Sequence, residues 1–294
     1  MDSLQKELDV IQISGNDAET FIQGQITNDI KILSDEKKSI YTGYCSPKGR
    51  LLAIFFIIKI KKNYYLFCPP CISKSISKRL MMFVLRSDVE ITCSPENIDY
   101  YLVNKDNIET LSDDLISLPK KIMQTTLNQN ESLAITMLGG FENYFFIVGE
   151  KETLHIYKNK IKTNLFSWNQ IHIENIIPNI FKETQDMFIP QSLNLDLINA
   201  INFKKGCYTG QEVVARTHYL GKPKRRLYQG CIELEEIPKI GSDILVDNEK
   251  VGSLINFYKQ KNNVFKILVE LRIEKVDARP NLNGYEIHSL IMQH

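Results

Sequence analysis

Residues 203–226 of this 294-residue chain read FKKGCYTGQEVVARTHYLGKPKRR. This stretch is the most polar and least periodic part of the sequence, and it holds seven basic residues against one acid, Glu212. Its formal charge is therefore +6, whereas the whole chain has 36 basic and 35 acidic residues and a net charge of +1. The balanced total argues against a protein that presents a basic surface everywhere. For the local segment, a solvated surface and an anion-binding site are both open interpretations.

The residues around Cys207 predict the start of a helix. Thr209 and Glu212 have the spacing of a capping box, so we expect Thr209 to cap a helix that continues through Val213. Cys207 would then lie immediately before the helix, close to Lys204 and Lys205. Helix N-termini and nearby cations both stabilise a thiolate, which makes Cys207 the cysteine best suited to react.

Two glycines flank this cysteine. Gly206 and Gly210 permit a close approach of other backbone, since neither carries a Cβ. The segment is therefore interpreted either as a thiolate or anion site at a helix start, or as a small residue in a tight turn. The residues alone do not separate these two interpretations.

Composition and length set the class of protein. A chain of 294 residues with 43% apolar and 24% charged residues can bury a core and accommodate about two domains. Its longest unbroken apolar run, residues 51–58, is far shorter than the roughly 20 residues of a membrane span. The first residues carry charges and lack the apolar core of a signal peptide, so we expect a soluble cytoplasmic protein without membrane contact.

Six scattered cysteines do not form a disulfide framework, and we expect free thiols. Cys68-Pro-Pro-Cys71 has metal-ligand spacing but no accompanying pair, so we interpret it as two half-buried thiols at a strand end. The five histidines show no paired-ligand spacing, and we expect no metal site.

The hydrophobic pattern predicts an α+β fold. Alternation predicts strands over residues 8–13, 39–45, 51–60, 64–68, 89–93, 100–103, 133–138 and 144–148. Helical spacing predicts helices at 18–22, at 72–83 and near 151–162. A hairpin turn is expected at residues 46–49, another turn at Gly139-Gly140, and a small all-β domain from about residue 227.

The segment Lys205-Gly206-Cys207-Tyr208-Thr209-Gly210-Gln211-Glu212 resembles the signature of the YgfZ family of folate-binding proteins. This family is related to the T-protein, the aminomethyltransferase of the glycine cleavage system. Further blocks resemble it in the expected order, at residues 14–18, 21–29, 46–50, 188–191, 194–195 and 214–216. The resemblance therefore extends from about residue 8 to residue 226.

The resemblance implies a three-lobed ring of T-protein-like subdomains with a small C-terminal β-barrel. It places the folate-binding α+β region, two intertwined subdomains, in residues 1–226 and the barrel in residues 227–294. It also implies tetrahydrofolate or a one-carbon derivative as ligand. Partners would be iron–sulfur client proteins, including radical enzymes that thiolate tRNA, whose clusters the protein helps to make or repair.

The resemblance further assigns the site residues. Cys207 would be the functional thiol. Trp168, the one tryptophan of the chain, lies where the family has a folate-contacting tryptophan, although a lone tryptophan is also typical of a core. The remaining folate-binding candidates are Lys205, Gly206, Tyr208, Gly210, Gln211, Glu212 and Arg216, and the +6 segment suits the anionic glutamyl tail of folate.

Two other functions remain as alternatives. A tetrahydrofolate-dependent aminomethyltransferase of the glycine-cleavage type needs a carboxylate near the substrate amine, but residues 59–87 contain neither Asp nor Glu, so we lean against an enzyme of that type. Direct tRNA binding would use three aromatic residues, Tyr208, His218 and Tyr219, interleaved with Lys222, Lys224, Arg225 and Arg226. The charge balance of the rest of the chain makes it the weaker interpretation.

Overall fold

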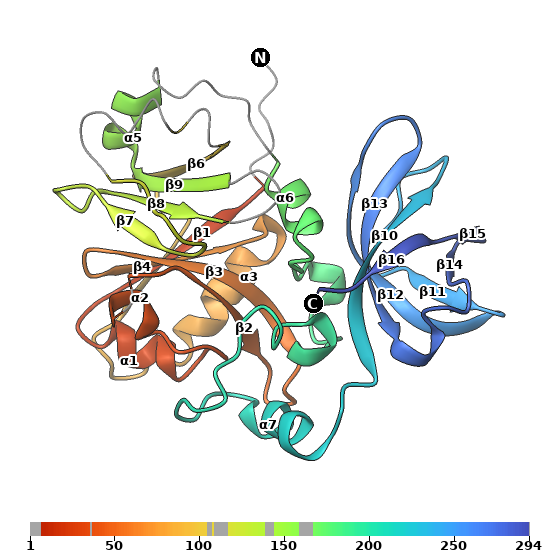
Figure 1. The fold of residues 1–294 in the computed structure, drawn as a ribbon. Coiled ribbons are helices and arrows are strands. Elements are labelled where there is room, and N and C mark those ends of the chain that lie inside the picture. Colours follow the sequence, from red (N-terminus) through yellow and green to blue (C-terminus); the bar gives the residue numbers. More distant parts are fainter. Residues whose placement is uncertain are drawn as a thin grey trace. The chain divides into compact units, whose positions relative to one another are not determined.

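The computed structural model describes residues 7–35, 37–104, 108, 117–138, 144–158 and 167–293. The chain divides into two compact units (Figure 1). The first unit contains Met1–Gly24, Asp29–Tyr41 and Phe55–Trp168. The second contains Gln25–Asn28, Thr42–Ile54 and Asn169–His294. Neither unit is one continuous piece of chain, because two short N-terminal segments are part of the second.

A five-stranded sheet is built from the first 93 residues. Its strand order is β2 (Ile40–Cys45), β3 (Leu51–Ile60), β4 (Asn63–Cys68), β1 (Asp9–Ser14) and β5 (Glu90–Cys93). β3 is buried along almost its whole length, as expected for its continuous apolar run. The helix α3 (Pro70–Met81) buries Ile72, Ile76 and Leu80, which recur at helical spacing. The short helices α1 (Ala18–Gln23) and α2 (Ile32–Asp35) lie between β1 and β2 in the sequence.

A four-stranded antiparallel sheet completes the first unit. Its order is β6 (Ile98–Asn104), β9 (Tyr144–Glu150), β8 (Leu133–Met137) and β7 (Thr125–Leu127), and α5 (Lys151–Lys158) follows β9. Ile108, Ile135, Ile147 and Leu154 are part of its buried core.

The second unit continues with α6 (Trp168–Glu174, from residue 169 on), the short 3₁₀ helices η2 (Lys182–Thr184) and η3 (Pro190–Leu193), and α7 (Gln211–Leu220). A seven-stranded antiparallel sheet follows. Its strands are β10 (Arg225–Glu233), β11 (Asp243–Val246), β12 (Glu249–Lys259), β13 (Val264–Arg272), β14 (Asn281–Leu282), β15 (Tyr285–Glu286) and β16 (His288–Ile291), with the 3₁₀ helix η4 (Ile273–Lys275) after β13.

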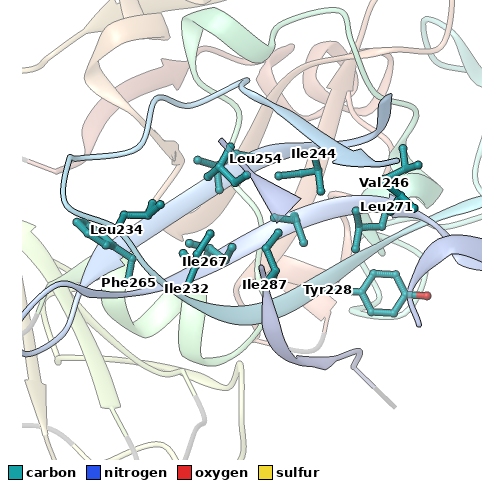
Figure 2. Close-up of a cluster of buried hydrophobic side chains, with 13 residues drawn as sticks. Tyr228, Ile232, Leu234, Ile244, Val246, Leu254, Phe265, Ile267, Leu271 and Ile287 are labelled. Atoms are coloured by element: carbon teal, nitrogen blue, oxygen red, sulfur yellow. The ribbon is translucent and has the colours of Figure 1, made fainter. Parts of the chain in front are cut away.

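This last sheet is a nearly closed barrel. Its order is β15-β14-β11-β12-β13-β10-β16, and β10 contacts both β16 and β15. Figure 2 shows its interior, where Ile232, Leu254, Phe265 and Ile267 point toward one another, each at most 2% exposed. A closed sheet with a filled interior is a self-sufficient core.

The α+β prediction and the C-terminal barrel are confirmed. Every expected strand forms, with ends that differ by at most two residues, and the three expected helices are α1, α3 and α5. The sequence pattern missed β7 and α6, which are too short to show a period. The turn at Gly139-Gly140 and the end of the expected helix at 159–162 lie outside the described residues. The boundary at residues 226 and 227 stays a prediction.

Within the described part of the chain, no helix combines the length and the apolar character that crossing a membrane requires.

Replacing Ile267 by alanine should test the barrel core. Ile267 is 0% exposed, so Ile267→Ala leaves a cavity and should lower the free energy of unfolding by about 2–4 kcal/mol. Ile291→Ala is the matched control, since Ile291 lies in the same barrel but is 53% exposed and should change little. Urea unfolding followed by circular dichroism measures both, and equal losses would contradict the described core.

Candidate functional site

The loop that carries Cys207 is fixed at one end by the Lys205 ammonium group. Lys205 Nζ donates hydrogen bonds to the backbone oxygens of Ile26, at 2.7 Å, and Asn28, at 2.8 Å. The residue is 9% exposed, and its Nζ lies 5.2 Å from the centre of the Tyr208 ring. These contacts give Lys205 a positioning role, because its charge is engaged inside the second unit.

Residues 26–28 are in turn bound to the chain just before this loop. Thr27 Oγ1 donates to the oxygen of Ala200 at 2.7 Å, and Asn28 Nδ2 donates to the oxygen of Asn199 at 2.8 Å. The backbone N–H of Asn202 donates to the oxygen of Thr27 at 3.0 Å. The N-terminal block 21–29 and the 205–212 signature are therefore neighbours in space as well as parts of one resemblance.

The other end of the loop is fixed by a close contact between two glycines. The turn at residues 46–50 is closed by a 2.8 Å hydrogen bond from the N–H of Ser46 to the oxygen of Arg50. A Cβ on Gly210 would lie 2.4 Å from the Ser46 oxygen, and one on Gly49 would lie 2.6 Å from Val213 Cβ. Both glycines also have positive φ, +83° and +69°, so each position needs glycine for two reasons.

The expected capping box is wrong. α7 begins at Gln211, its N-cap is Gly210, and no side chain makes a capping hydrogen bond there. The left-handed conformation of Gly210 places the helix start one residue after the position that Thr209 would require. The expected close backbone approach is confirmed at Gly210 but wrong at Gly206, where an added Cβ would meet nothing within 4 Å.

Cys207 is exposed, while Lys205 and Tyr208 on either side of it are buried. It lies three residues before the N-cap of α7, further from the helix than expected. No described residue makes a hydrogen bond to its sulfur. Of the expected neighbouring cations, Lys204 is exposed and Lys205 is bound to backbone carbonyls. The loop thus presents a single thiol outward from two fixed ends.

The other thiols differ sharply in exposure. Burial raises the pKa of Cys45 to about 12 and that of Cys68 well above its ordinary value. Cys71, on the first turn of α3, is exposed. The expectation of two half-buried thiols is therefore wrong, because one side chain points into the sheet core and the other into solvent. Among the described residues, no group of His, Cys, Asp or Glu is arranged to hold a metal ion.

Trp168 belongs to the first unit and packs in an aromatic cluster. Its ring centroid lies 5.5 Å from that of Phe56 and 5.3 Å from that of Phe146, and it is 2% exposed. The structure thus shows the core environment that the sequence left open. Its contact with folate stays a prediction.

The basic segment divides into engaged and exposed cations. Arg226 makes a bidentate ion pair with Asp196, at 2.6 and 2.9 Å, and Arg225 pairs with the buried Glu270 at 2.7 Å. Arg216, Lys222 and Lys224 are exposed instead. Gln211 and Glu212 lie on the first turn of α7, half-buried and exposed respectively.

The 188–191 and 194–195 blocks bind two elements of the second unit: α7, which lies within the basic segment, and β10, which begins at its end. Gln191 Nε2 donates to the oxygen of Val214 in α7 at 2.6 Å, and Asn194 Nδ2 donates to the oxygen of Leu227 in β10 at 2.9 Å. The partners of Gln191 and Asn194 are backbone groups far away in sequence. The spacing of residues in the sequence therefore could not predict that these two side chains position α7 and β10.

A cleft of about 850 Å³ lies beside α7 in the second unit. About half of the residues that line it belong to the basic segment, in α7 and the 221–225 connection. The lining also includes Arg50 from the 46–50 turn and Lys250 from β12. Sequence reasoning missed Lys250, which lies outside every block of the resemblance. We call this hollow the basic cleft.

Known proteins provide two comparisons. The chain is 31% identical over 262 residues to the tRNA-modifying protein YgfZ of Buchnera aphidicola, covering 87% of this chain and 81% of that protein. It is 28% identical over 262 residues to the protein of the same name from Colwellia psychrerythraea, covering 86% and 79%. No profile of a known protein family matches the chain.

Among solved structures, the chain is similar to the glycine cleavage system aminomethyltransferase T from Bartonella henselae. The TM-score is 0.71 at 14% sequence identity, covering 96% of this chain and 83% of that one. At this identity the likeness concerns the fold alone, and it confirms the T-protein-like architecture.

Alanine at the two glycines of the Cys207 loop should affect the stability of the protein very differently. Gly210→Ala puts a Cβ against the Ser46 oxygen at positive φ and should lower the free energy of unfolding by about 2–3 kcal/mol. Gly206→Ala meets open space and should change it by less than about 0.5 kcal/mol. Denaturant unfolding measures both, and a neutral Gly210→Ala would contradict the close contact.

Thiol modification should follow the exposure of each cysteine. With a maleimide at pH 7, Cys207 and Cys71 should react fast, whereas Cys45 and Cys68 stay protonated and shielded because burial raises the pKa of each. Peptide mass spectrometry after timed quenching reads each site. Rapid labelling of Cys45 in the folded protein would contradict this order.

Proposed function

The chain belongs to the YgfZ family of tRNA-modifying proteins, and from this premise we propose that it binds tetrahydrofolate or a one-carbon derivative of it. In this proposal the protein supports the synthesis or repair of iron–sulfur clusters in client enzymes, including enzymes that thiolate tRNA. Cys207 is the functional thiol of that activity.

The observation that carries the proposal is the exposure of Cys207 on a loop that is fixed at both ends. Lys205 binds two backbone oxygens before it, and Gly210 packs on the 46–50 turn after it. A cysteine that served only to fill a turn would be covered by its neighbours, whereas Cys207 is exposed. Holding a thiol outward at a defined place suits contact with a partner.

A cluster role for Cys207 has to be a shared one. Thiolates are the usual ligands of iron–sulfur clusters, but a cluster takes several of them. Since the described residues offer no group of metal-ligating side chains, Cys207 would supply one ligand to a cluster that the client also holds. In this role Cys207 contacts the cluster of the client transiently, and the protein does not hold a cluster permanently.

The residues present fit folate in charge and only partly in shape. Arg216, on the exposed side of α7, suits the anionic glutamyl tail. Trp168 is 2% exposed beside Phe56 and Phe146, so a pterin would reach its ring only if a neighbouring side chain moved. When bound, tetrahydrofolate would supply a carrier for one-carbon units.

The second candidate is an aminomethyltransferase of the glycine-cleavage type, which the likeness of the fold favours. Against it, the residues where the T-protein is expected to hold its acid, 59–87, form the end of β3, β4 and α3 without any carboxylate. A cationic amine would lack its counter-charge there. Release of a one-carbon unit from an aminomethyl donor by the pure protein would favour this candidate over the first.

Substitution of Cys207 separates ligand binding from the role of the thiol. Cys207→Ala should abolish restoration of tRNA thiolation in cells that lack the endogenous protein, while calorimetric binding of tetrahydrofolate stays within about two-fold of the parent. Cys71→Ala is the matched control, because Cys71 is also exposed but lies on α3, and it should keep both properties.

Folate binding is measured by titration with tetrahydrofolate and 5-formyltetrahydrofolate, using the fluorescence of Trp168 and heat as independent signals. Full tRNA thiolation with Cys207→Ala would contradict the proposed role of the Cys207 thiol. An absence of heat with both folates would contradict the proposal that the protein binds folate.

A further inference from the structure

The basic cleft gathers cations from separate parts of the second unit. Its volume is about 850 Å³, and it is lined by residues of α7, of the 221–225 connection, of β12 and β13, and by Arg50. The stretch 187–192 adds Met187, Phe188, Ile189 and Ser192 to the lining. Six of its lining residues are basic: Arg50, Arg216, Lys222, Lys224, Arg225 and Lys250. The one acid in the lining is Glu270.

Most of this charge is not neutralised by the protein. Arg225 is paired with Glu270 at 2.7 Å, and Lys250 is paired with Asp243 at 2.6 Å. The other four cations have no carboxylate within 4.0 Å among the described residues: Arg50, Arg216, Lys222 and Lys224. Of these, Arg50 donates a hydrogen bond from Nη1 to the backbone oxygen of Met187. Cations gathered in one hollow repel each other, and an anion with several charges relieves that repulsion.

Aromatic rings are exposed on the same helix. His218 stacks on Phe203 with ring centroids 3.6 Å apart, and Tyr219 lies edge-on to His218 at 4.7 Å. Tyr219 is 65% exposed. At 3.6 residues per turn it lies about 60° around α7 from Arg216, which lines the cleft, so an exposed ring and an exposed cation are neighbours on the helix surface.

We propose that the basic cleft binds the phosphate backbone of RNA, with an unpaired base stacking on Tyr219. Stacking platforms beside a basic groove are the combination by which proteins hold single-stranded nucleic acid. An acidic polypeptide would use the cations but not the ring. This inference does not depend on folate binding or on Cys207.

The structure also corrects the composition of such an RNA surface. From sequence, Tyr208, Arg225 and Arg226 would belong to it. Tyr208 is 8% exposed and the two arginines are bound to Glu270 and Asp196. The RNA-binding cations are therefore Lys222, Lys224, Arg216 and Arg50, the last of which lies outside the basic segment.

The test is binding of a fluorescently labelled, unmodified tRNA transcript to the full chain, measured by anisotropy between 50 and 300 mM salt. Lys222→Gln with Lys224→Gln should weaken binding about ten-fold at the lowest salt and reduce the slope of log K against log salt by roughly 1.4, two phosphate contacts of a single strand. Lys239→Gln with Lys261→Gln is the matched control. It makes the same change of net charge at exposed positions outside the cleft and should leave both quantities unchanged.

A second variant tests whether bases are recognised. Tyr219→Ala should weaken binding of the transcript about ten-fold without changing the salt slope, because it removes stacking and no charge. Binding of a fully paired RNA duplex should be insensitive to Tyr219→Ala. Competition with poly-L-glutamate at equal charge should displace little transcript.

Three results would overturn the proposal: no binding of the transcript at 50 mM salt, equal losses in the two lysine pairs, or displacement by poly-L-glutamate together with no effect of Tyr219→Ala. The last would identify the cleft as a site for acidic polypeptides. Binding of tetrahydrofolate to the Lys222/Lys224 variant is measured separately by calorimetry. A failure of RNA binding can therefore be told apart from a failure of folate binding.

Discussion

The approach of the Gly210 backbone to the turn at residues 46–50 is the contact on which the geometry of the Cys207 loop depends. A Cβ on Gly210 would come within 2.4 Å of the Ser46 oxygen, so the start of α7 lies directly on the turn. The Lys205 ammonium group holds the other end of the same loop by two backbone oxygens. Cys207 is therefore displayed by backbone geometry rather than by side-chain contacts to its sulfur.

Local patterns in the sequence were sufficient for most of the fold. Apolar patterns located the strands and helices of the first unit. Helices such as α3 bury one face and show its period, whereas β3 and β9 are buried on both faces and appear as continuous apolar runs. The pattern failed where an element is short, as for β7 and α6, and where backbone geometry outweighs side-chain preference. At Gly210 the left-handed conformation supplies the helix start, and the Thr209 hydroxyl makes no capping hydrogen bond.

For the site, the sequence identified the segment and its most accessible thiol but not the roles of its cations. Seven basic residues look alike in one dimension, yet the fold binds Arg226 to Asp196, Arg225 to Glu270 and Lys205 to carbonyls of residues 26 and 28. Each of these partners is 30 or more residues away in sequence, so no local pattern could reveal them. Of the four basic residues that remain exposed, Arg216, Lys222 and Lys224 line the basic cleft together with Arg50 from the turn, and Lys204 does not.

The division of the chain between the two units sets an order of events during synthesis. Thr42–Ile54, with its turn, leaves the ribosome about 160 residues before Gly210, the residue against which it packs. At about 5–20 residues per second, this segment waits roughly 8–32 s for its partner. The first unit is complete at residue 168 and can fold during this time, so the two units fold one after the other. The thiol loop is complete only when residue 212 has been added, so a nascent chain displays it after the first unit is finished and before the barrel strands are made.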